Sequence, residues 1–253
     1  MKTNHFLAAA AFIALSAGAA LAADVPAYIQ AAVADSTRPE SDTSRDVNRH
    51  PGELLAFAGI KPGMSVVDVS PGTGYFTRIF AKAVGPTGHV YAYISNAGDA
   101  RLKAAGKDPD NQFADIKAAY PNVTVLHGPF SAFATPAPVD VVWTSDNLHD
   151  FHNGPTAAAD LAAMTKGIFA SLKPGGIYMV VDHRAAKGAG AAATSALHRM
   201  DEDIAKQEIQ AAGFKLVAES DILKNPSDDN TKRVFEQGEH DHTDQFVLKF
   251  QKP

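Results

Sequence analysis

The chain contains no cysteine among its 253 residues. This absence excludes disulfide bonds, zinc–thiolate centres and cysteine nucleophiles. A run of basic residues is also missing, and the formal net charge is −5 with histidine neutral. Because an acidic chain without a basic patch has little attraction for phosphate backbones, we expect no nucleic-acid partner.

The N-terminal apolar run is too short to cross a bilayer. It extends from Phe6 to Leu15, about half of the roughly 20 residues that a membrane helix needs. Lys2 precedes this run, and the small-residue pattern Ala20-Leu21-Ala22 follows it. We therefore predict a signal peptide at residues 1–22 and a periplasmic or secreted protein with no stable membrane anchor.

The remainder, residues 23–253, has the pattern of one α/β domain. Short apolar segments alternate with amphipathic ones, which implies crossover connections and a mostly parallel sheet. The predicted strands are 65–69, 90–94, 123–127, 139–144, 177–182, 214–220 and 245–251. The predicted helices are 76–84, 110–119, 157–172 and 201–212. Only a loop separates the last two strands, which favours an antiparallel pair at one edge of the sheet.

The segment before the first strand, residues 23–60, is predicted to form N-terminal helices and a lid. Helices are expected at 24–35 and 51–58, with Gly59 as the stop signal of the second. The polar segment 36–50 between them is predicted to be a loop. Its residues Arg45, Arg49 and His50 are positioned to close over a site.

The segment that follows the first predicted strand carries the strongest functional signal. An apolar run containing Asp68 leads into Ser70-Pro71-Gly72-Thr73-Gly74, and an amphipathic segment starts directly afterwards. This order predicts a strand, a loop whose backbone can touch a ligand, and a helix N-terminus that faces the ligand. A dinucleotide fingerprint would require glycine at position 77, where the chain has Thr77.

This stretch resembles the first nucleotide-binding loop of class I S-adenosylmethionine-dependent methyltransferases, whose pattern is an acid, a spacer and three glycines at alternate positions. Asp68 matches the acid, Gly72 and Gly74 match two glycines, and Ser70 replaces the first glycine. The resemblance extends from about residue 51 to the C-terminus. It implies a Rossmann-like fold with a seven-stranded mostly parallel sheet, an antiparallel edge strand and helices on both faces. Arg49-His50-Pro51 is similar to a segment of an exported bacterial methyltransferase-like group.

The resemblance implies S-adenosylmethionine as the cofactor and methyl transfer to a small molecule as the activity. The implied cofactor-binding residues follow the first four strands: Asp68, Ser70, Gly72, Gly74, Ser95, Phe130, Ser131 and Asp146. Where the family has an acid for the ribose hydroxyls, this chain has Ser95 and Asn96, either of which would be a weaker acceptor than a carboxylate. A buried position in a turn is the alternative interpretation of Phe130.

The loop after the fourth strand, residues 145–152, is the predicted catalytic segment. It is rich in Asp, Asn and His directly after a very apolar strand, and loops in such positions often carry chemistry. We predict His149 as the base that accepts the acceptor's proton and Asp150 as the residue that orients it. The alternative interpretation is a cluster that caps the next helix. An Asn-Pro-Pro-aromatic signature is missing, which argues against methylation of a nucleobase amine.

Other polar residues leave further alternatives open. A set of oxygen and nitrogen ligands is offered by Asp146, His149, Asp182 and His183. This set loosely resembles the metal site of catechol-type methyltransferases, but we predict a site without a metal. His198 precedes a helix and is a further candidate for the cleft. Residues 239–242 are predicted to be a solvated loop. The rival functions are a non-catalytic periplasmic ligand-binding protein that retains the fold and, less favoured, a metal-dependent hydrolase.

Overall fold

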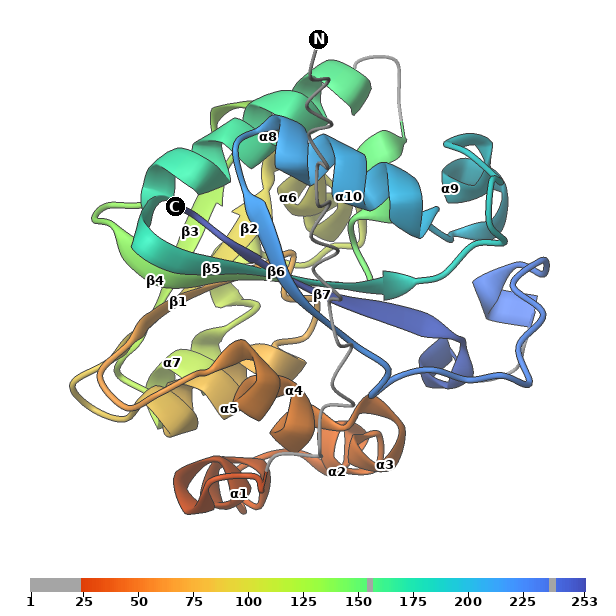
Figure 1. Cartoon of the computed structure of the whole chain (residues 1–253). Coiled ribbons are helices and arrows are strands. Elements are labelled where there is room, and N and C mark those ends of the chain that lie inside the picture. Colours follow the sequence, from red (N-terminus) through yellow and green to blue (C-terminus); the bar gives the residue numbers. More distant parts are fainter. Residues whose placement is uncertain (1–23, 154–156, 237–239) are drawn as a thin grey trace, which may run out of the picture.

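The computed structural model describes residues 24–153, 157–236 and 240–253. The predicted signal peptide lies outside these residues. Within them, one seven-stranded sheet has the order β3-β2-β1-β4-β5-β7-β6 (Figure 1). The strands are β1 (Ser65–Val69), β2 (His89–Ser95), β3 (Val123–Gly128), β4 (Val139–Ser145), β5 (Leu172–His183), β6 (Lys215–Ser220) and β7 (Gln245–Gln251). The predicted fold class is confirmed.

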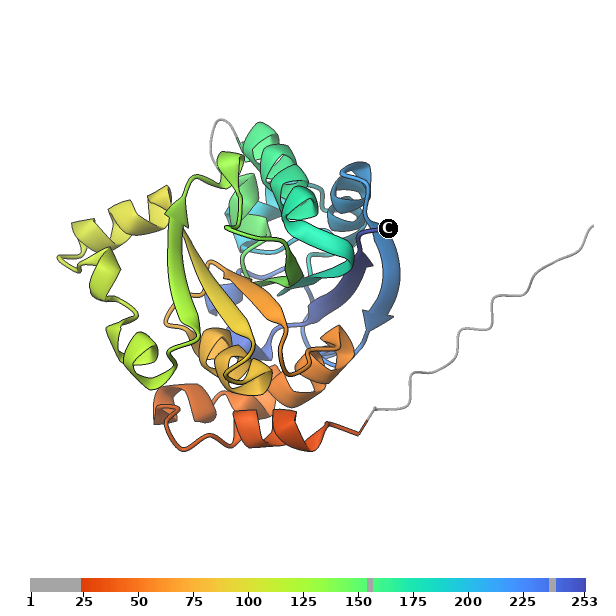
Figure 2. The same cartoon turned by 90° about the vertical axis from the view of Figure 1, so that its left-hand side faces the viewer.

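Helices cover both faces of the sheet (Figures 1 and 2). One face carries α1 (Ala27–Val33), α4 (Pro51–Ala58), α5 (Tyr75–Val84) and α7 (Ala114–Ala119), and the other carries α8 (Ala157–Ser171) and α10 (Glu202–Ala211). The remaining α-helices are α2 (Glu40–Thr43), α3 (Asp46–Arg49), α6 (Asn96–Ala104) and α9 (Ala192–Leu197). Helices α6 and α9 were not predicted, and α2 and α3 lie in the segment predicted to be a loop.

The antiparallel pair forms at the predicted edge of the sheet. Strand β7 runs antiparallel to both β5 and β6, with Gln251 opposite Ile177 on one side and Lys215 on the other. It therefore lies between these two strands, and β6 is the outermost strand. Among the residues that the structure describes, no helix combines the length and apolar character needed to cross a membrane.

An aromatic group holds α5 against the centre of the sheet. Trp143 of β4 is fully buried, and its ring centroid lies 4.9 Å from that of Phe76 and 5.1 Å from that of Phe80. Full burial of a large apolar side chain contributes roughly 1.5–3 kcal/mol. This packing fixes the first turn of α5, and with it the glycine loop that joins β1 to α5.

The sheet order reverses between β1 and β4. Strand β1 pairs in parallel with β2 on one side and β4 on the other, so Val67 lies between Tyr91 and Val142. At such a switch point the loops leave the carboxyl ends of neighbouring strands in opposite directions and open a crevice for a ligand. The segments after β1, β2, β4 and β5 therefore meet at one edge of the sheet.

Candidate active site

A cavity of about 1080 Å³ lies at this edge, somewhat beyond the roughly 300–1,000 Å³ of usual ligand pockets. Such a volume accommodates a nucleoside-sized group and a second small molecule. Of the ten predicted site residues, these line the cavity: Ser70, Gly72, Ser95, Phe130, Ser131, Asp146, His149 and Asp150. Asp68 and Gly74 do not belong to its lining.

The loop between β1 and α5 has a left-handed backbone at three positions, with φ of 53° at Ser70, 59° at Gly72 and 87° at Gly74. A Cβ atom on Gly72 would meet no atom within 4 Å, whereas one on Gly74 would collide with Ile116. Gly72 thus offers bare backbone to the cavity, as predicted. Gly74 has a packing role, because its missing side chain makes room for Ile116 of α7, and its contact with a ligand stays a prediction.

Asp68 anchors the loop, one of the two roles expected for it, the other being a contact with the cofactor. Its carboxylate is 3% exposed and accepts a 2.7 Å hydrogen bond from Thr77 Oγ1 in α5. Burial raises the pKa of Asp68 to about 7, although the Thr77 bond and the charge of Arg49 oppose the rise. Asp68 therefore ties the end of β1 to α5, and Thr77 occupies the position where a dinucleotide-binding loop has glycine.

We expect Asp68→Asn to gain stability relative to the wild type as the pH rises from 4 to 7. The folded-state pKa of about 7 lies above the unfolded value of 3.8. The wild-type folded state therefore holds an extra proton between these values, and its stability falls as the pH rises through them. The free-energy difference between the two proteins should grow by up to about 4 kcal/mol. Urea unfolding at several pH values measures it, and parallel pH curves would contradict it.

Ser95 at the end of β2 is the N-cap of α6. Its Oγ accepts a 3.0 Å hydrogen bond from the backbone N–H of Gly98 while the residue lines the cavity. The nearest acid in sequence, Asp99, does not belong to the cavity lining and binds His127 Nδ1 at 2.9 Å. A carboxylate at the position where the family holds the ribose is thus absent from the lining.

Ser95→Asp is expected to tighten S-adenosylmethionine binding about two- to thirtyfold, since hydrogen bonds to a charged acceptor contribute roughly 0.5–2 kcal/mol more than neutral ones. Aspartate is as good an N-cap as serine, so α6 should remain intact. Ile94→Asp is the paired variant: Ile94 also lines the cavity, but its side chain packs in the core and is 6% exposed, and neighbouring strand residues point to opposite faces, so no gain is expected there. Calorimetry measures both affinities. No gain in the folded Ser95→Asp protein would contradict a ribose at this strand.

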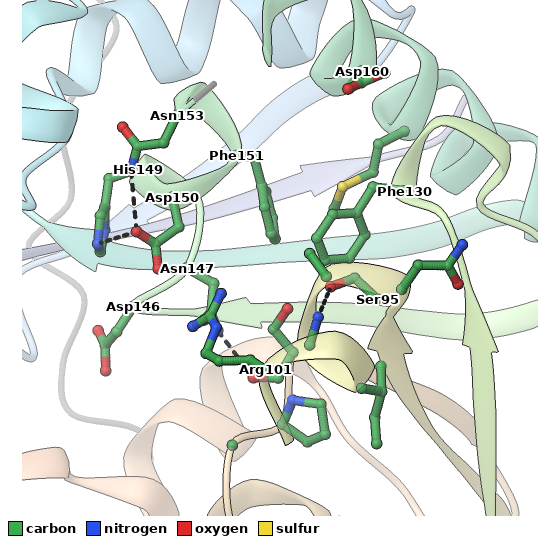
Figure 3. Close-up of a pocket in the computed structure, with 18 of the residues that line it drawn as sticks. Ser95, Arg101, Phe130, Asp146, Asn147, His149, Asp150, Phe151, Asn153 and Asp160 are labelled. Atoms are coloured by element: carbon green, nitrogen blue, oxygen red, sulfur yellow. Dashed lines mark hydrogen bonds and ion pairs between the residues drawn. The ribbon is translucent and has the colours of Figure 1, made fainter. Parts of the chain in front are cut away.

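Aromatic side chains form the middle of the cavity. Figure 3 shows Phe130 and Phe151 between Ser95 on one side and the His149–Asp150 turn on the other, and their ring centroids lie 4.5 Å apart. Phe130 is half-buried and also stacks near Tyr93 at 6.1 Å. The cavity therefore offers an apolar surface to planar groups, and Phe130 is placed to contact them, although its neighbours also give it a packing role.

The proposed base, His149, lies in the short turn after β4 and is 4% exposed. Its Nδ1 donates to Asp182 Oδ1 at 2.7 Å, and its backbone N–H donates to Asp182 Oδ2 at 2.7 Å. Asp150 lies beside the other ring nitrogen, with Oδ1 3.5 Å from Nε2, and its side chain is 44% exposed. Asp182, rather than the predicted Asp150, therefore orients the ring, because the parallel ends of β4 and β5 lie side by side.

The charges around His149 favour its protonated form. Burial by itself lowers the pKa of the ring, but the charge and hydrogen bond of Asp182, with smaller contributions from Asp150 and Asp146, raise it to about 9. For the neighbouring His198, burial and the charge of His149 lower the pKa. His149 is consequently protonated at neutral pH, so it can act as a base only after it loses the proton on Nε2, which becomes favourable above about pH 9.

Asp146 connects the site to the N-terminal helices. It adopts a left-handed conformation with φ of 58°, and its Oδ2 lies 3.1 Å from Arg49 Nη2. Arg49 also donates to Ser145 Oγ at 3.0 Å, and both Arg45 and Arg49 bind Asp241. The predicted lid residues Arg45 and Arg49 thus lie over the ends of the central strands.

The third predicted lid residue does not join this group. His50 instead lies 3.4 Å from Glu53 on its own segment. The loop predicted to be solvated, 239–242, contributes Asp241 to the arginine contacts, so that prediction is wrong for Asp241, while residue 239 lies outside the described residues.

From the sequence, Asp182 was considered only as a possible metal ligand, and its role in orienting His149 was missed. Asn147, whose side chain donates to Ser70 O at 3.3 Å, was also missed. The signal for Asp182 was its position at the end of β5 next to the catalytic loop. A role could be assigned to Asp182 from that position only once the order of the strands in the sheet was known.

Comparisons with known proteins agree with this geometry. Residues 60–239 match the family model described as a methyltransferase domain. A ubiquinone/menaquinone biosynthesis C-methyltransferase from Burkholderia orbicola is 29% identical over 191 residues, covering 72% of this chain and 70% of the relative. The rival prediction of a non-catalytic binding protein gains no support from these matches.

Solved structures share the fold. A methyltransferase from Aquifex aeolicus is 18% identical with a TM-score of 0.53, covering 85% of this chain and 96% of the other. An N1-methyltransferase from Burkholderia thailandensis, solved with S-adenosylhomocysteine, is 19% identical with a TM-score of 0.52, covering 85% and 80%. The sheet order, the glycine loop and the family match together show that this chain belongs to the class I S-adenosylmethionine-dependent methyltransferases.

Proposed function

We propose that the protein methylates a small molecule in the cavity, with His149 as the proton acceptor and Asp182 as its positioning residue. The observation that carries the proposal is that His149, which Asp182 holds from behind, lines the same cavity as the bare backbone of Gly72. S-adenosylmethionine, when bound, supplies a methyl group on a sulfonium that an acceptor atom can attack. The residues present suit this cofactor, because Gly72 leaves room for it and Phe130 offers an apolar surface to the rings of its adenine.

The side chains would contribute mainly by positioning. The glycine loop and the aromatic pair Phe130 and Phe151 would hold donor and acceptor in one orientation, and such alignment alone can remove a large part of a barrier. In its neutral form, which prevails above about pH 9, His149 would take the acceptor's proton at Nε2. The carboxylate of Asp182 would keep Nε2 turned toward the cavity and stabilise the imidazolium that forms.

The acceptor is proposed to be a planar ring that carries a hydroxyl or another acidic group. The aromatic lining of Phe130, Phe151 and Phe235 suits a flat ring, and His149 suits a group that must lose a proton. The curated relatives named for ubiquinone and menaquinone biosynthesis make quinol precursors the first compounds to assay. Transfer of a labelled methyl group to any member of a phenol and quinol panel tests this proposal. Transfer only to non-aromatic acceptors would contradict it.

We also propose that residues 1–22 form a cleaved signal peptide and that residues 23–253 act as one domain in the periplasm or outside the cell. The charged start, apolar run and Ala20-Leu21-Ala22 of the sequence support this proposal. The similarity of Arg49-His50-Pro51 to an exported methyltransferase-like group points the same way. Cell fractionation with mass spectrometry of the N-terminus tests it: a protein that starts at Ala23 outside the cytoplasm is expected, and an intact cytoplasmic chain would contradict it.

A further inference from the structure

His149, Asp150 and His198 place three metal-ligating atoms together at one end of the cavity. Asp150 Oδ1 lies 3.5 Å from His149 Nε2 and 3.6 Å from His198 Nδ1. Each of the three residues offers one ligand atom within 4.8 Å of the other two. Ligands that bind a tetrahedral zinc ion at about 2.0–2.1 Å are separated by roughly 3.4 Å, so the observed spacings need little adjustment.

We infer that these three residues form a binding site for a divalent transition-metal ion, of which zinc is the best match. Two imidazoles and one carboxylate are a donor set that zinc and ferrous iron accept, whereas magnesium and calcium prefer oxygen ligands alone. All three residues line the cavity. The remaining coordination positions therefore face the space where a substrate would lie, as in catalytic rather than structural sites.

The surroundings hold the ligands in place before any ion binds. Asp182, which is fully buried, receives both the Nδ1–H and the backbone N–H of His149, and this leaves Nε2 as the ligand atom. Histidine ligands commonly donate their second nitrogen to a carboxylate in this way. Asn153 Nδ2 donates to Asp150 Oδ1 at 3.2 Å and supports the rotamer of that side chain.

His198 is held in place by the residues at the end of α9. It ends α9 in a left-handed conformation with φ of 54°. The next residue, Arg199, is fully buried and bonded to Asp228 and to the carbonyl oxygens of Lys232 and Arg184. The chain directly after His198 is thus anchored, which limits the freedom that this ligand would lose when an ion binds.

One contact opposes metal binding and provides a test. Arg233 Nη2 lies 3.3 Å from His198 Nε2. Because an arginine can only donate, Nε2 accepts this hydrogen bond, and the proton of the neutral ring is on Nδ1. Metal binding at Nδ1 requires the proton to move to Nε2 and Arg233 to withdraw. The guanidinium also repels a cation. Arg233→Gln should therefore tighten metal binding, an effect opposite to that of removing a ligand.

The test is equilibrium dialysis and calorimetry of the full chain with Zn²⁺ alone, supported by the visible absorption of bound Co²⁺. We expect one ion per wild-type chain and at least about tenfold weaker binding in His198→Ala and in Asp150→Asn. His89→Ala is the matched control, because His89 bonds to Thr124 and does not belong to the cavity lining. Equal Zn²⁺ affinity in wild type and both ligand variants, with all proteins folded by circular dichroism, would overturn the site.

This inference does not depend on methyl transfer, because the ion alone is the probe. A cation at Nε2 would occupy the nitrogen that the proposed function assigns to the acceptor's proton, so we expect Zn²⁺ to inhibit methylation. If one Zn²⁺ binds per chain and methylation becomes faster, the metal site is supported and His149 is not the base. Binding to none of the proteins, with methylation intact, would overturn the metal site and leave the proposed function standing.

Discussion

His149→Ala should lower the rate of methyl transfer by about 10²–10⁴-fold, the usual contribution of a general base. Cofactor affinity should change by less than about tenfold, or 1.4 kcal/mol, since the proposed role concerns the acceptor's proton. Rapid-mixing assays and calorimetry measure the two quantities separately. Loss of affinity and rate together would show that His149 positions the cofactor instead of accepting a proton.

Two variants separate the orienting residue from its exposed neighbour. Asp182→Asn leaves the shape of the carboxyl group but removes its charge, and it should reduce the rate nearly as much as the loss of His149. Asp150→Asn should have a smaller effect, because Asp150 is exposed and lies 3.5 Å from Nε2. Equal losses in the two variants would contradict the role of Asp182 as the orienting residue.

The second large effect is expected from Gly72→Val, which should weaken S-adenosylmethionine binding by at least about a hundredfold, or roughly 2.7 kcal/mol. The backbone at Gly72 has a φ of 59° and borders the cavity, so a branched side chain would add both strain and bulk where the ligand approaches.

Gly175→Val, a substitution within β5, is the matched control for Gly72→Val. Gly175 also has a positive φ, 76°, and open space around its Cβ position, but it does not belong to the cavity lining. Both variants should lose similar stability, and only Gly72→Val should lose affinity. If the two proteins bind the cofactor equally well, the glycine loop is not part of the site.

The fold was predictable because its signals are local and repeated. Apolar strands alternate with amphipathic helices, and the predicted bounds of α4 and β7 coincide with the observed ones. Helix α6 was missed because it contains no buried residue and follows β2 without a break. Its start depends on the Ser95 cap, which sequence reasoning had assigned to a ligand instead.

The site was less predictable because its contacts join segments far apart in the chain. His149 was identified from the polar loop after an apolar strand, but its partner Asp182 is 33 residues away. Only the pairing of β4 with β5 brings the two together. The packing role of Gly74 was missed for the same reason, because its neighbour Ile116 lies 42 residues further along the chain.

Calorimetric titration of the purified protein with S-adenosylmethionine and S-adenosylhomocysteine tests the central claim most directly. Binding of one molecule per chain is expected, with a dissociation constant well below about 1 mM, which corresponds to roughly −4.1 kcal/mol. The affinity should fall in Gly72→Val and remain in Gly175→Val. Failure of the folded wild-type protein to bind either compound at millimolar concentration would contradict the assignment of this cavity to the cofactor.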